Sequence, residues 1–233
     1  MLKQNFINLE LRKQSTAVSL VLIIVLIITI FIFCFIGYKI LSLPETRFDI
    51  YVFDQLKKIT NAANTRLMID ITFFGSRTFL FPAYLLLCLY FLFVVKDVII
   101  AIYVTIIGAI GNEIWISMQQ LFHRNRPLDP LIQKITDYGY PSGHSFSAFT
   151  FFGLLIYFTW QSTLKKSWKI IFSIVLLIAP VLIAISRVYL HMHFVTDVIG
   201  GSCLAIAWLI ISISLLIYLK RKFFNRKENF RQL

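Results

Sequence analysis

Charged residues are scarce in this sequence, and cysteines and flexible linkers are scarcer still. Only 15% of the 233 residues are charged, against about 25% in a soluble domain, and 58% are hydrophobic. The three cysteines, Cys34, Cys88 and Cys203, lie within apolar stretches, and this argues against a disulfide framework and a zinc cluster. No stretch rich in glycine, serine or proline divides the chain. We therefore expect a single unit over residues 1–233 that is integral to a membrane.

Long apolar runs take the place of charge in this sequence. Several of them reach the ~20 residues that cross a bilayer. They predict an all-α fold, a bundle of six transmembrane helices at residues 18–41, 78–95, 98–121, 146–160, 170–188 and 195–219. The first run is too long for the core of a signal peptide and lacks a clear cleavage site, so we expect a retained helix. The predicted location is the plasma membrane, with several passes through the lipid bilayer.

The segment 44–77, between the first two runs, is not apolar enough to span a bilayer. Within it, the sequence FDQLKKI places Phe53, Leu56 and Ile59 on one face of a helix. Such a helix can lie in the membrane interface, here on the outer surface, or it can be an ordinary connecting helix. The predicted fold includes it as an interfacial helix after the first span.

The net charge of +12 would suit a nucleic-acid partner, but the positions of the basic residues argue against one. They lie mainly between and after the apolar runs, where they orient a membrane protein. An even number of spans puts both termini on one side of the bilayer. That side carries 13 of the 23 basic residues, including Lys3, Arg12 and Lys13 of the N-terminal tail. The positive-inside rule therefore predicts that both termini are cytoplasmic.

With this topology, three polar clusters fall together on the extracytoplasmic side. They are FHRNRP at residues 122–127, PSGH at 141–144 and SRVYLHMHFVTD at 186–197. Each cluster adjoins the end of an apolar run, and none is needed for membrane insertion. Ionisable groups at membrane depth cost free energy, so the clusters are candidates for a functional site.

The chemistry of the clusters favours an anion such as phosphate. Arg124, Arg126 and Arg187 carry planar guanidinium groups whose donors match phosphate oxygens. Ser142 and Gly143 precede an apolar helix. Backbone N–H groups and the positive end of the helix dipole are therefore directed at whatever binds there.

Two histidines add the groups for covalent chemistry. His193 and Asp197 are four residues apart and share a helical face, where the carboxylate can orient the imidazole and stabilise its positive form. His144 is a second imidazole that could protonate a leaving group. Together with the arginines, these residues are the parts required for phosphoryl transfer through a histidine.

The three clusters resemble the signature of the type 2 phosphatidic acid phosphatase superfamily. This family includes bacterial phosphatidylglycerophosphatase B, undecaprenyl-diphosphate phosphatases and vanadium haloperoxidases. Its signature reads K-x6-R-P, then P-S-G-H, then S-R-x5-H-x3-D. The second and third motifs match in full here, whereas the first reads Gln119-x6-Arg126-Pro127, so the motif region covers residues 119–197. The six-span plan extends the resemblance to nearly the whole chain.

By this resemblance, the chain is a membrane lipid phosphatase that acts through a phosphohistidine. His193 attacks the phosphorus, Asp197 orients His193, and His144 protonates the leaving group and later helps to activate water. The other implied residues hold the phosphoryl oxygens, and they are Arg126, Arg187, Ser142, Gly143 and, in the lysine's position, Gln119. The resemblance implies no metal and no cofactor, and the acidic clusters of a metal phosphatase are missing from the sequence.

Gln119 departs from the family signature. Glutamine can still donate hydrogen bonds, but it carries no charge. A charge-assisted contact is worth ~1.5–3 kcal/mol, so its loss would lower the rate or the affinity roughly tenfold to a hundredfold. Arg124 or His123 could supply the charge instead; otherwise Arg124 anchors the helix end at lipid headgroups. A slow or specialised enzyme is the other interpretation.

Further polar residues lie outside the motif positions. Asn112 and Glu113 fall inside the third predicted span, where we expect either a helix-packing hydrogen bond or a water-lined cavity. His191 and His123 match no motif position, and we expect them to be membrane-interface residues.

The expected substrate is a lipid phosphate of the outer leaflet. By analogy with the family, undecaprenyl diphosphate is the first choice, and phosphatidylglycerophosphate and phosphatidate are the others. Two alternatives are open. One is a phosphotransferase that passes the phosphoryl group to an acceptor other than water, and the other is a weak or non-catalytic member of the family.

Overall fold

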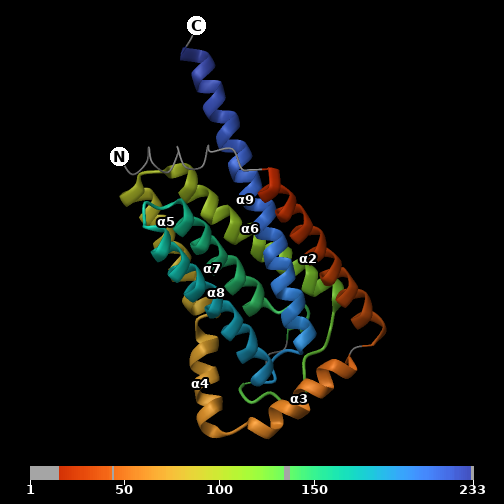
Figure 1. Ribbon diagram of the computed structural model, residues 1–233. Coiled ribbons are helices and arrows are strands. Elements are labelled where there is room, and N and C mark those ends of the chain that lie inside the picture. The colour runs from red at the N-terminus through yellow and green to blue at the C-terminus, as the bar shows by residue number, and fades with distance from the viewer. Residues whose placement is uncertain (1–15, 44, 134–136, 232–233) are drawn as a thin grey trace.

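The structure is a computed structural model that describes residues 16–43, 45–133 and 137–231. Within this part of the chain all regular structure is helical (Figure 1), which confirms the all-α prediction. The helices are α2 (Thr16–Ser42), α3 (Arg47–Ile59), α4 (Ala62–Phe73), α5 (Arg77–Leu89) with its π-helical continuation η1 (Tyr90–Val95), α6 (Val98–Phe122), α7 (Gly143–Gln161), α8 (Lys166–Tyr189) and α9 (Val195–Arg231). The charges predicted to orient the N-terminal tail, Lys3, Arg12 and Lys13, lie outside the described residues.

Five helical stretches of the described chain are long and apolar enough to cross a membrane. They are Ala17–Ser42, Ala62–Val95, Val98–Phe122, Lys166–Tyr189 and Val195–Lys220. These stretches contain five of the six predicted spans, and the second begins early because α4 leads into α5. A multi-pass membrane protein is therefore confirmed, whereas the count of six stays a prediction.

Helix α7 occupies the position of the remaining predicted span, 146–160, and it is less apolar than the other five. Its first turns carry His144, Ser145 and Ser147. It packs against α5, α6, α8 and α9, so much of its surface meets protein instead of lipid. Further along, Leu154 and Phe158 join a buried cluster with residues of α6. A helix in such surroundings can carry polar side chains that a lipid-facing helix would not tolerate.

The helix predicted between the first two spans is α3, which lies across one end of the bundle (Figure 1). A capping box that includes Asp49 closes its first turn. Val52, Phe53 and Leu56 pack on the ends of α8 and α9. Ile59 was predicted to share this apolar face but is 54% exposed, because it is the last residue of the helix and Val52 makes the contact instead.

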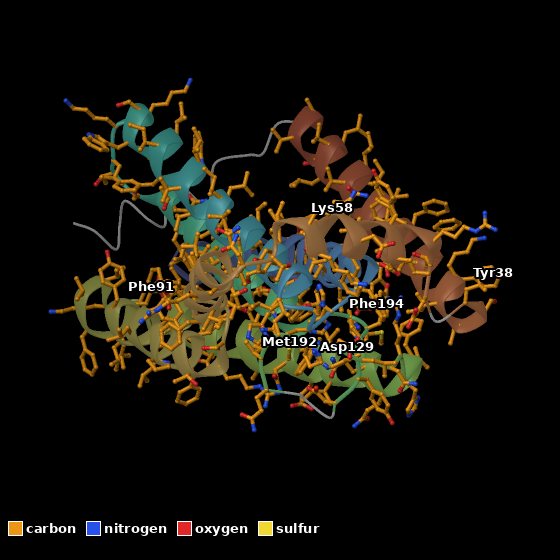
Figure 2. The ribbon with its side chains drawn as sticks, turned by 90° about the horizontal axis from the view of Figure 1, so that it is seen from below. Tyr38, Lys58, Phe91, Asp129, Met192 and Phe194 are labelled. Carbon is orange, nitrogen blue, oxygen red and sulfur yellow. The ribbon has the colours of Figure 1, made fainter. Side chains whose placement is uncertain are left out.

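The three polar clusters meet at the end of the bundle that α3 covers. The first follows α6, the second precedes α7, and the third joins α8 to α9. Seen from that end, Asp129, Met192 and Phe194 lie near the middle and Tyr38 lies toward the edge (Figure 2). The first turn of α2 and the last turns of α9 lie at the opposite end (Figure 1). Which side of the membrane the clusters face stays a prediction.

Candidate active site

The loop after α6 brings the first two clusters together. His123 caps α6 in the left-handed conformation, with a φ of 47°, and its N–H donates to the carbonyl of Gln119 at 3.1 Å. The chain then crosses the end of the bundle, where Gly139 N–H donates to the Arg124 carbonyl at 2.7 Å. Ser142 N–H donates to the Asp197 carbonyl at 3.0 Å, which attaches the start of α7 to the start of α9.

A tight turn between α8 and α9 positions the third cluster. The Arg187 carbonyl accepts hydrogen bonds from the N–H groups of Met192, at 3.0 Å, and His193, at 3.3 Å. His191, which lies between the end of α8 and these two residues, has a φ of 54°. This turn returns the chain to the end of α8, so His193 comes to lie beside Arg187.

His193 is almost fully buried, and both of its ring nitrogens face charged groups. Nδ1 is 3.5 Å from Oδ2 of Asp197, and Nε2 is 2.9 Å from Nη1 of Arg126. A guanidinium group can only donate, so we assign the proton to Nδ1 and the lone pair to Nε2. Burial, followed by the charges of Arg126 and Arg187, lowers the pKa of His193 well below its usual value. The lowered pKa favours the neutral imidazole, with the lone pair of Nε2 on the side away from Asp197.

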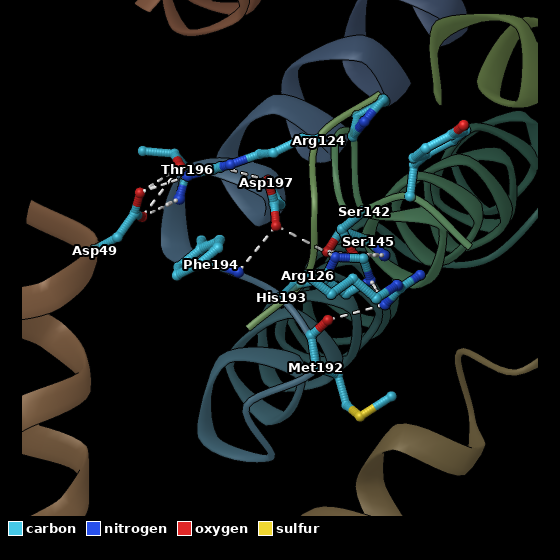
Figure 3. A network of polar contacts seen from close by, with 12 residues as sticks. Asp49, Arg124, Arg126, Ser142, Ser145, Met192, His193, Phe194, Thr196 and Asp197 are labelled. Carbon is cyan, nitrogen blue, oxygen red and sulfur yellow. Dashed lines mark hydrogen bonds and ion pairs between the residues drawn. The ribbon is translucent and has the colours of Figure 1, made fainter. Parts of the chain in front are cut away.

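Asp197 belongs to a buried charged network (Figure 3). Its Oδ2 accepts the N–H of Phe194 at 2.9 Å, and its Oδ1 is 2.5 Å from Nη1 of Arg124. Arg124 also pairs with Oδ2 of Asp49 on α3 at 2.9 Å. Asp49 also contacts the start of α9, because the Thr196 N–H donates to its Oδ1 at 3.0 Å. Arg124 was predicted as a substitute phosphate ligand or a headgroup anchor, and the structure places it in neither role.

A cavity of about 310 Å³ opens on the other side of His193. Five of the predicted site residues line it, and they are His193, His144, Arg126, Arg187 and Gly143. The predicted residues Asp197, Ser142, Gln119 and Arg124 lie behind its wall. The remaining lining residues are Gly75, Arg77, Asn112, Trp115, Asp137 and Ser147.

Arg187 lines this cavity, and two of its buried donors are satisfied by no described residue. The side chain is only 2% exposed, and its Nη1 donates to Oγ1 of Thr72 at 3.0 Å. Its Nε and Nη2 are buried and have no hydrogen-bond partner among the described residues. Buried donors without partners cost free energy, and a bound anion with two oxygens would satisfy both nitrogens at once.

Arg126 is held more firmly than Arg187. Its Nε donates to the Asp137 carbonyl at 2.9 Å, its Nη1 to the Met192 carbonyl at 2.9 Å, and its Nη2 lies 2.8 Å from Oδ1 of Asp137. The Asp137 side chain is 47% exposed. The Arg126 side chain is only 11% exposed, so water reaches this pair from the Asp137 side alone, and a phosphate dianion that binds Arg126 competes with Asp137 for it.

The start of α7 approaches the cavity through Gly143. Ser142, fully buried, caps the helix with its hydroxyl oxygen. A Cβ at Gly143 would come within 2.5 Å of the Trp115 ring, so a larger residue would displace the indole. Trp115 is fixed in turn, because its Nε1–H donates to the Pro141 carbonyl at 3.0 Å. The backbone at the helix N-terminus is thereby kept beside the cavity.

Gln119 was predicted to contact phosphate, but its side chain binds the protein backbone and does not line the cavity. Gln119 is buried, and its Nε2 donates to the carbonyls of Tyr138 at 2.7 Å and Pro141 at 3.4 Å. It supports the loop that carries the second cluster. The physical reason lies in the helix geometry, since Gln119 is on α6 two turns before Arg126 and points at the loop backbone.

Sequence analysis also predicted the surroundings of four polar residues outside the motif positions. Asn112 lines the cavity, in agreement with one of its two predicted surroundings, and lies 3.4 Å from Glu113. His191 was predicted at the membrane interface but is buried, with its ring stacked on Phe53 at 4.8 Å, because α3 covers it. His123 is exposed, with its ring edge against Tyr138.

Sequence reasoning missed Asp49, Arg77, Trp115 and Asp137. None of them belongs to a motif. Asp49, Arg77 and Trp115 meet their partners at the site far along the chain, and Asp137 meets Arg126 across the loop after α6. For Asp49 a signal was present, because an acidic residue in the first turn of a helix marks a cap. Nothing in the sequence pairs it with Arg124.

Comparison with known proteins identifies relatives by sequence. Residues 84–221, which contain the whole motif region, match the family model of the PAP2 superfamily. The chain is 32% identical to phosphatidylglycerophosphatase B of Bacillus subtilis (strain 168) over 170 residues, which are 71% of this chain and 77% of that protein. It is 37% identical to dolichyldiphosphatase 1 of Mus musculus over 91 residues, which are 33% of this chain and 37% of that protein.

Two solved structures share the fold. The transmembrane PAP2-type phosphatidylglycerolphosphate phosphatase of Bacillus subtilis superposes with a TM-score of 0.71 at 24% identity, covering 86% of this chain and 96% of that one. LpxE of Aquifex aeolicus gives 0.58 at 21% identity, covering 74% and 98%.

Proposed function

Because this chain belongs to the PAP2 superfamily and is a membrane lipid phosphatase, we propose that His193 takes the terminal phosphoryl group of its substrate and passes it to water. The observation that carries this proposal is the pair of unpartnered nitrogens on Arg187. Arg187 lines the same cavity as His193. A phosphoryl group bound by Arg187 therefore lies beside the nucleophile.

In the first step, Nε2 of His193 forms a bond to phosphorus while the bond from phosphorus to the leaving oxygen breaks. Arg126 transfers its hydrogen bond from Nε2 to a phosphoryl oxygen, and Arg187 donates from Nε and Nη2. Asp197 stabilises the positive charge that develops on the imidazole. The stabilising groups are in place before the substrate arrives, so little reorganisation is required.

His144 handles the protons of both steps. It donates a proton to the leaving oxygen, and it later accepts one from the water whose oxygen bonds to phosphorus as the P–N bond breaks. Burial and the charge of Arg187 lower the pKa of His144. The negative charge of a bound phosphate opposes these effects, so binding of substrate favours the protonated form that the first step requires.

The substrates named for the relatives support a lipid monophosphate or diphosphate. By its name, the Bacillus relative acts on phosphatidylglycerophosphate and the mouse relative on dolichyl diphosphate, a polyprenyl diphosphate. We propose the same range here: undecaprenyl diphosphate first, then phosphatidylglycerophosphate and phosphatidate. The positive charge comes from arginines and a helix N-terminus, so we propose a reaction that needs no metal ion.

Release of inorganic phosphate from these lipids in detergent micelles tests the proposal. We expect release that EDTA leaves unchanged and that His193→Ala reduces at least about 10⁴-fold in a protein with normal thermal stability. The same assay with an alcohol acceptor detects transfer in place of hydrolysis, which would indicate a phosphotransferase. A divalent-ion requirement would contradict the metal-independent mechanism, and no turnover of any lipid would indicate a non-catalytic family member.

We further propose that the cavity faces the extracytoplasmic side and that both termini are cytoplasmic. The support is the excess of basic residues on the predicted inner side. Asp129, in the loop after α6, and Ser167, in the first turn of α8, are both exposed. The end of α6 and the start of α8 lie at opposite ends of the bundle (Figure 1). A cysteine at Asp129 should react with an impermeant thiol reagent in intact cells, and one at Ser167 only after permeabilisation. The reverse pattern would invert the topology.

A further inference from the structure

One wall of the cavity comes from outside the three clusters. Gly75 and Arg77, at the junction of α4 and α5, and Asn112, Trp115 and Ser147, on α6 and α7, form it. Gly75 and Arg77 also precede residues 84–221, the part of the chain that matches the family model. The signature motifs therefore assign no role to the cation on this wall.

Arg77 is an exposed residue whose guanidinium group lies over an aromatic ring of the cavity lining. It is the first residue of α5, after the capping residue Ser76. Its guanidinium carbon lies 5.4 Å from the centroid of the Trp115 ring, and Trp115 itself is fixed by its hydrogen bond to Pro141 at 3.0 Å. Among the described residues Arg77 forms no ion pair. Its charge is therefore available to a ligand in the cavity.

Arg77 lies on the His144 side of the cavity. A Cβ at Gly75, two residues earlier, would come 3.3 Å from Cδ2 of His144 and 2.5 Å from Cγ2 of Ile183, so this glycine allows a close approach between the chain and the histidine. Burial lowers the pKa of His144 most, followed by the charges of Arg187, His193 and Arg126 and then by that of Arg77. Arg126 and Arg187 also lower the pKa of His193.

We propose that Arg77 binds the phosphate that stays with the lipid, and that it selects lipid diphosphates over lipid monophosphates. This inference rests on the proposed function, in which His144 stands at the leaving oxygen and His193 attacks from the other side. The attacked phosphorus is then bound by Arg126 and Arg187, and the second phosphate of a diphosphate reaches the wall that carries Arg77. Asn112 and Ser147 line the same cavity and offer neutral donors.

The chemistry of the two substrate classes explains the selection. In a diphosphate, the bond between the terminal phosphorus and the bridging oxygen breaks, and the bridging oxygen stays on a lipid monophosphate whose negative charge rises. Arg77 stabilises that charge in the transition state. In a monophosphate ester, the leaving group is an alcohol that needs only the proton of His144. The net reactions are lipid diphosphate plus water to lipid monophosphate plus phosphate, and lipid monophosphate plus water to alcohol plus phosphate.

A matched pair of substrates tests the proposal. Diacylglycerol pyrophosphate and phosphatidate with the same acyl chains differ only in the second phosphate. We expect Arg77→Gln to lower kcat/KM about 30-fold for diacylglycerol pyrophosphate and less than about threefold for phosphatidate. Arg77→Lys, which keeps the charge, should retain most of the preference for the diphosphate.

The control is Arg66→Gln, which removes an exposed arginine of α4 that does not line the cavity. It should change neither rate, and thermal unfolding in detergent should show that all three variants fold. An equal fall for both substrates would overturn the proposal, because Arg77 would then act on the attacked phosphoryl group. No fall for either would also overturn it and leave Arg77 as a surface cation. The proposed function fails separately, if His193→Ala turns over either substrate at the normal rate.

Discussion

Arg124 and Arg187 are almost equally buried, at 4% and 2% exposure, yet their guanidinium groups have opposite surroundings. Arg124 lies between two buried carboxylates, Asp49 and Asp197. Arg187 faces the cavity with two nitrogens that no described residue satisfies. His193 lies between these two regions and contacts both, with Asp197 on one side and Arg126 on the other.

The difference separates the groups that hold the nucleophile from those that bind its target. A buried charge with good partners is tolerated because its ion pairs replace its hydration, and removing one partner leaves the other uncompensated. A buried donor without partners destabilises the fold, so it persists where a ligand will satisfy it. In the proposed mechanism, the paired region positions Asp197 and hence His193, and the unpaired region receives the phosphoryl group.

The paired region should show the largest effect on stability. Arg124→Gln leaves Asp49 and Asp197 as buried carboxylates without their cation, so we expect a loss of about 3–5 kcal/mol in the free energy of unfolding. Thermal and denaturant unfolding in detergent measure it. Arg47→Gln, which removes an exposed arginine of the same helix as Asp49, is the matched control and should change stability by less than about 0.5 kcal/mol. An Arg124→Gln protein of normal stability would contradict the assignment of Arg124 to the paired region.

The unpaired region should show the opposite pattern. Arg187→Gln removes two donors aimed at the phosphoryl oxygens, so kcat/KM should fall about 100- to 1000-fold while the unfolding temperature stays the same or rises. Inorganic phosphate should raise the unfolding temperature of the natural protein but not that of the variant. If Arg187→Gln lost stability as well as activity, to the extent expected for Arg124→Gln, the distinction between the paired and unpaired regions would be wrong.

The pH dependence reports on the position of His193 between the two regions. His193 must be neutral to attack, and its pKa is lowered well below 6.5 by burial and by Arg126 and Arg187. As the pH falls, protonation of His144 should raise kcat/KM and protonation of His193 should lower it, so we expect a bell-shaped profile whose decline at low pH lies below pH 6.5. Arg187→Gln removes one of the lowering charges and should move this decline to higher pH. An unchanged pH profile in the variant would show that the Arg187 charge does not reach His193.

The smallest effect is expected at the position where the family has lysine. Gln119 donates to the carbonyls of Tyr138 and Pro141 and does not line the cavity. A lysine there can donate to the same carbonyls, so Gln119→Lys should change kcat/KM by less than about threefold. An increase in kcat/KM above tenfold would indicate that residue 119 reaches the bound phosphate. It would contradict the assignment of Gln119 to the support of the loop.

The sequence predicts the residues whose roles depend on local geometry. The start of α7 places Gly143 and His144 at a helix N-terminus, and the four-residue spacing of His193 and Asp197 puts them on one face. The order of the three clusters along six apolar runs also predicts that they meet at one end of a bundle. These inferences need only helix periodicity and a topology with short connections.

The remaining features depend on packing between distant segments. Asp49 meets Arg124 across 75 positions of sequence, and hydrophobic periodicity marks its helix only as amphipathic. The signature includes Arg187 and not Arg124, but it cannot predict that Arg124 lies between two carboxylates, because one of them, Asp49, is outside the motifs. Hydropathy likewise misses that α7 is surrounded by other helices, since the method treats every run as if it faced lipid.

The central claim is that Nε2 of His193 is the nucleophile, with Asp197 behind it and the arginine-lined cavity in front. The most direct test is to mix the protein with phosphatidate labelled in its phosphate, quench in alkaline denaturant that preserves phosphohistidine, and map the label by mass spectrometry and ³¹P NMR. The account predicts a labelled His193 phosphorylated on Nε2, and no label in His193→Ala. A phosphoryl group on Nδ1, which faces Asp197 at 3.5 Å, or on His144 or any other residue, would contradict it.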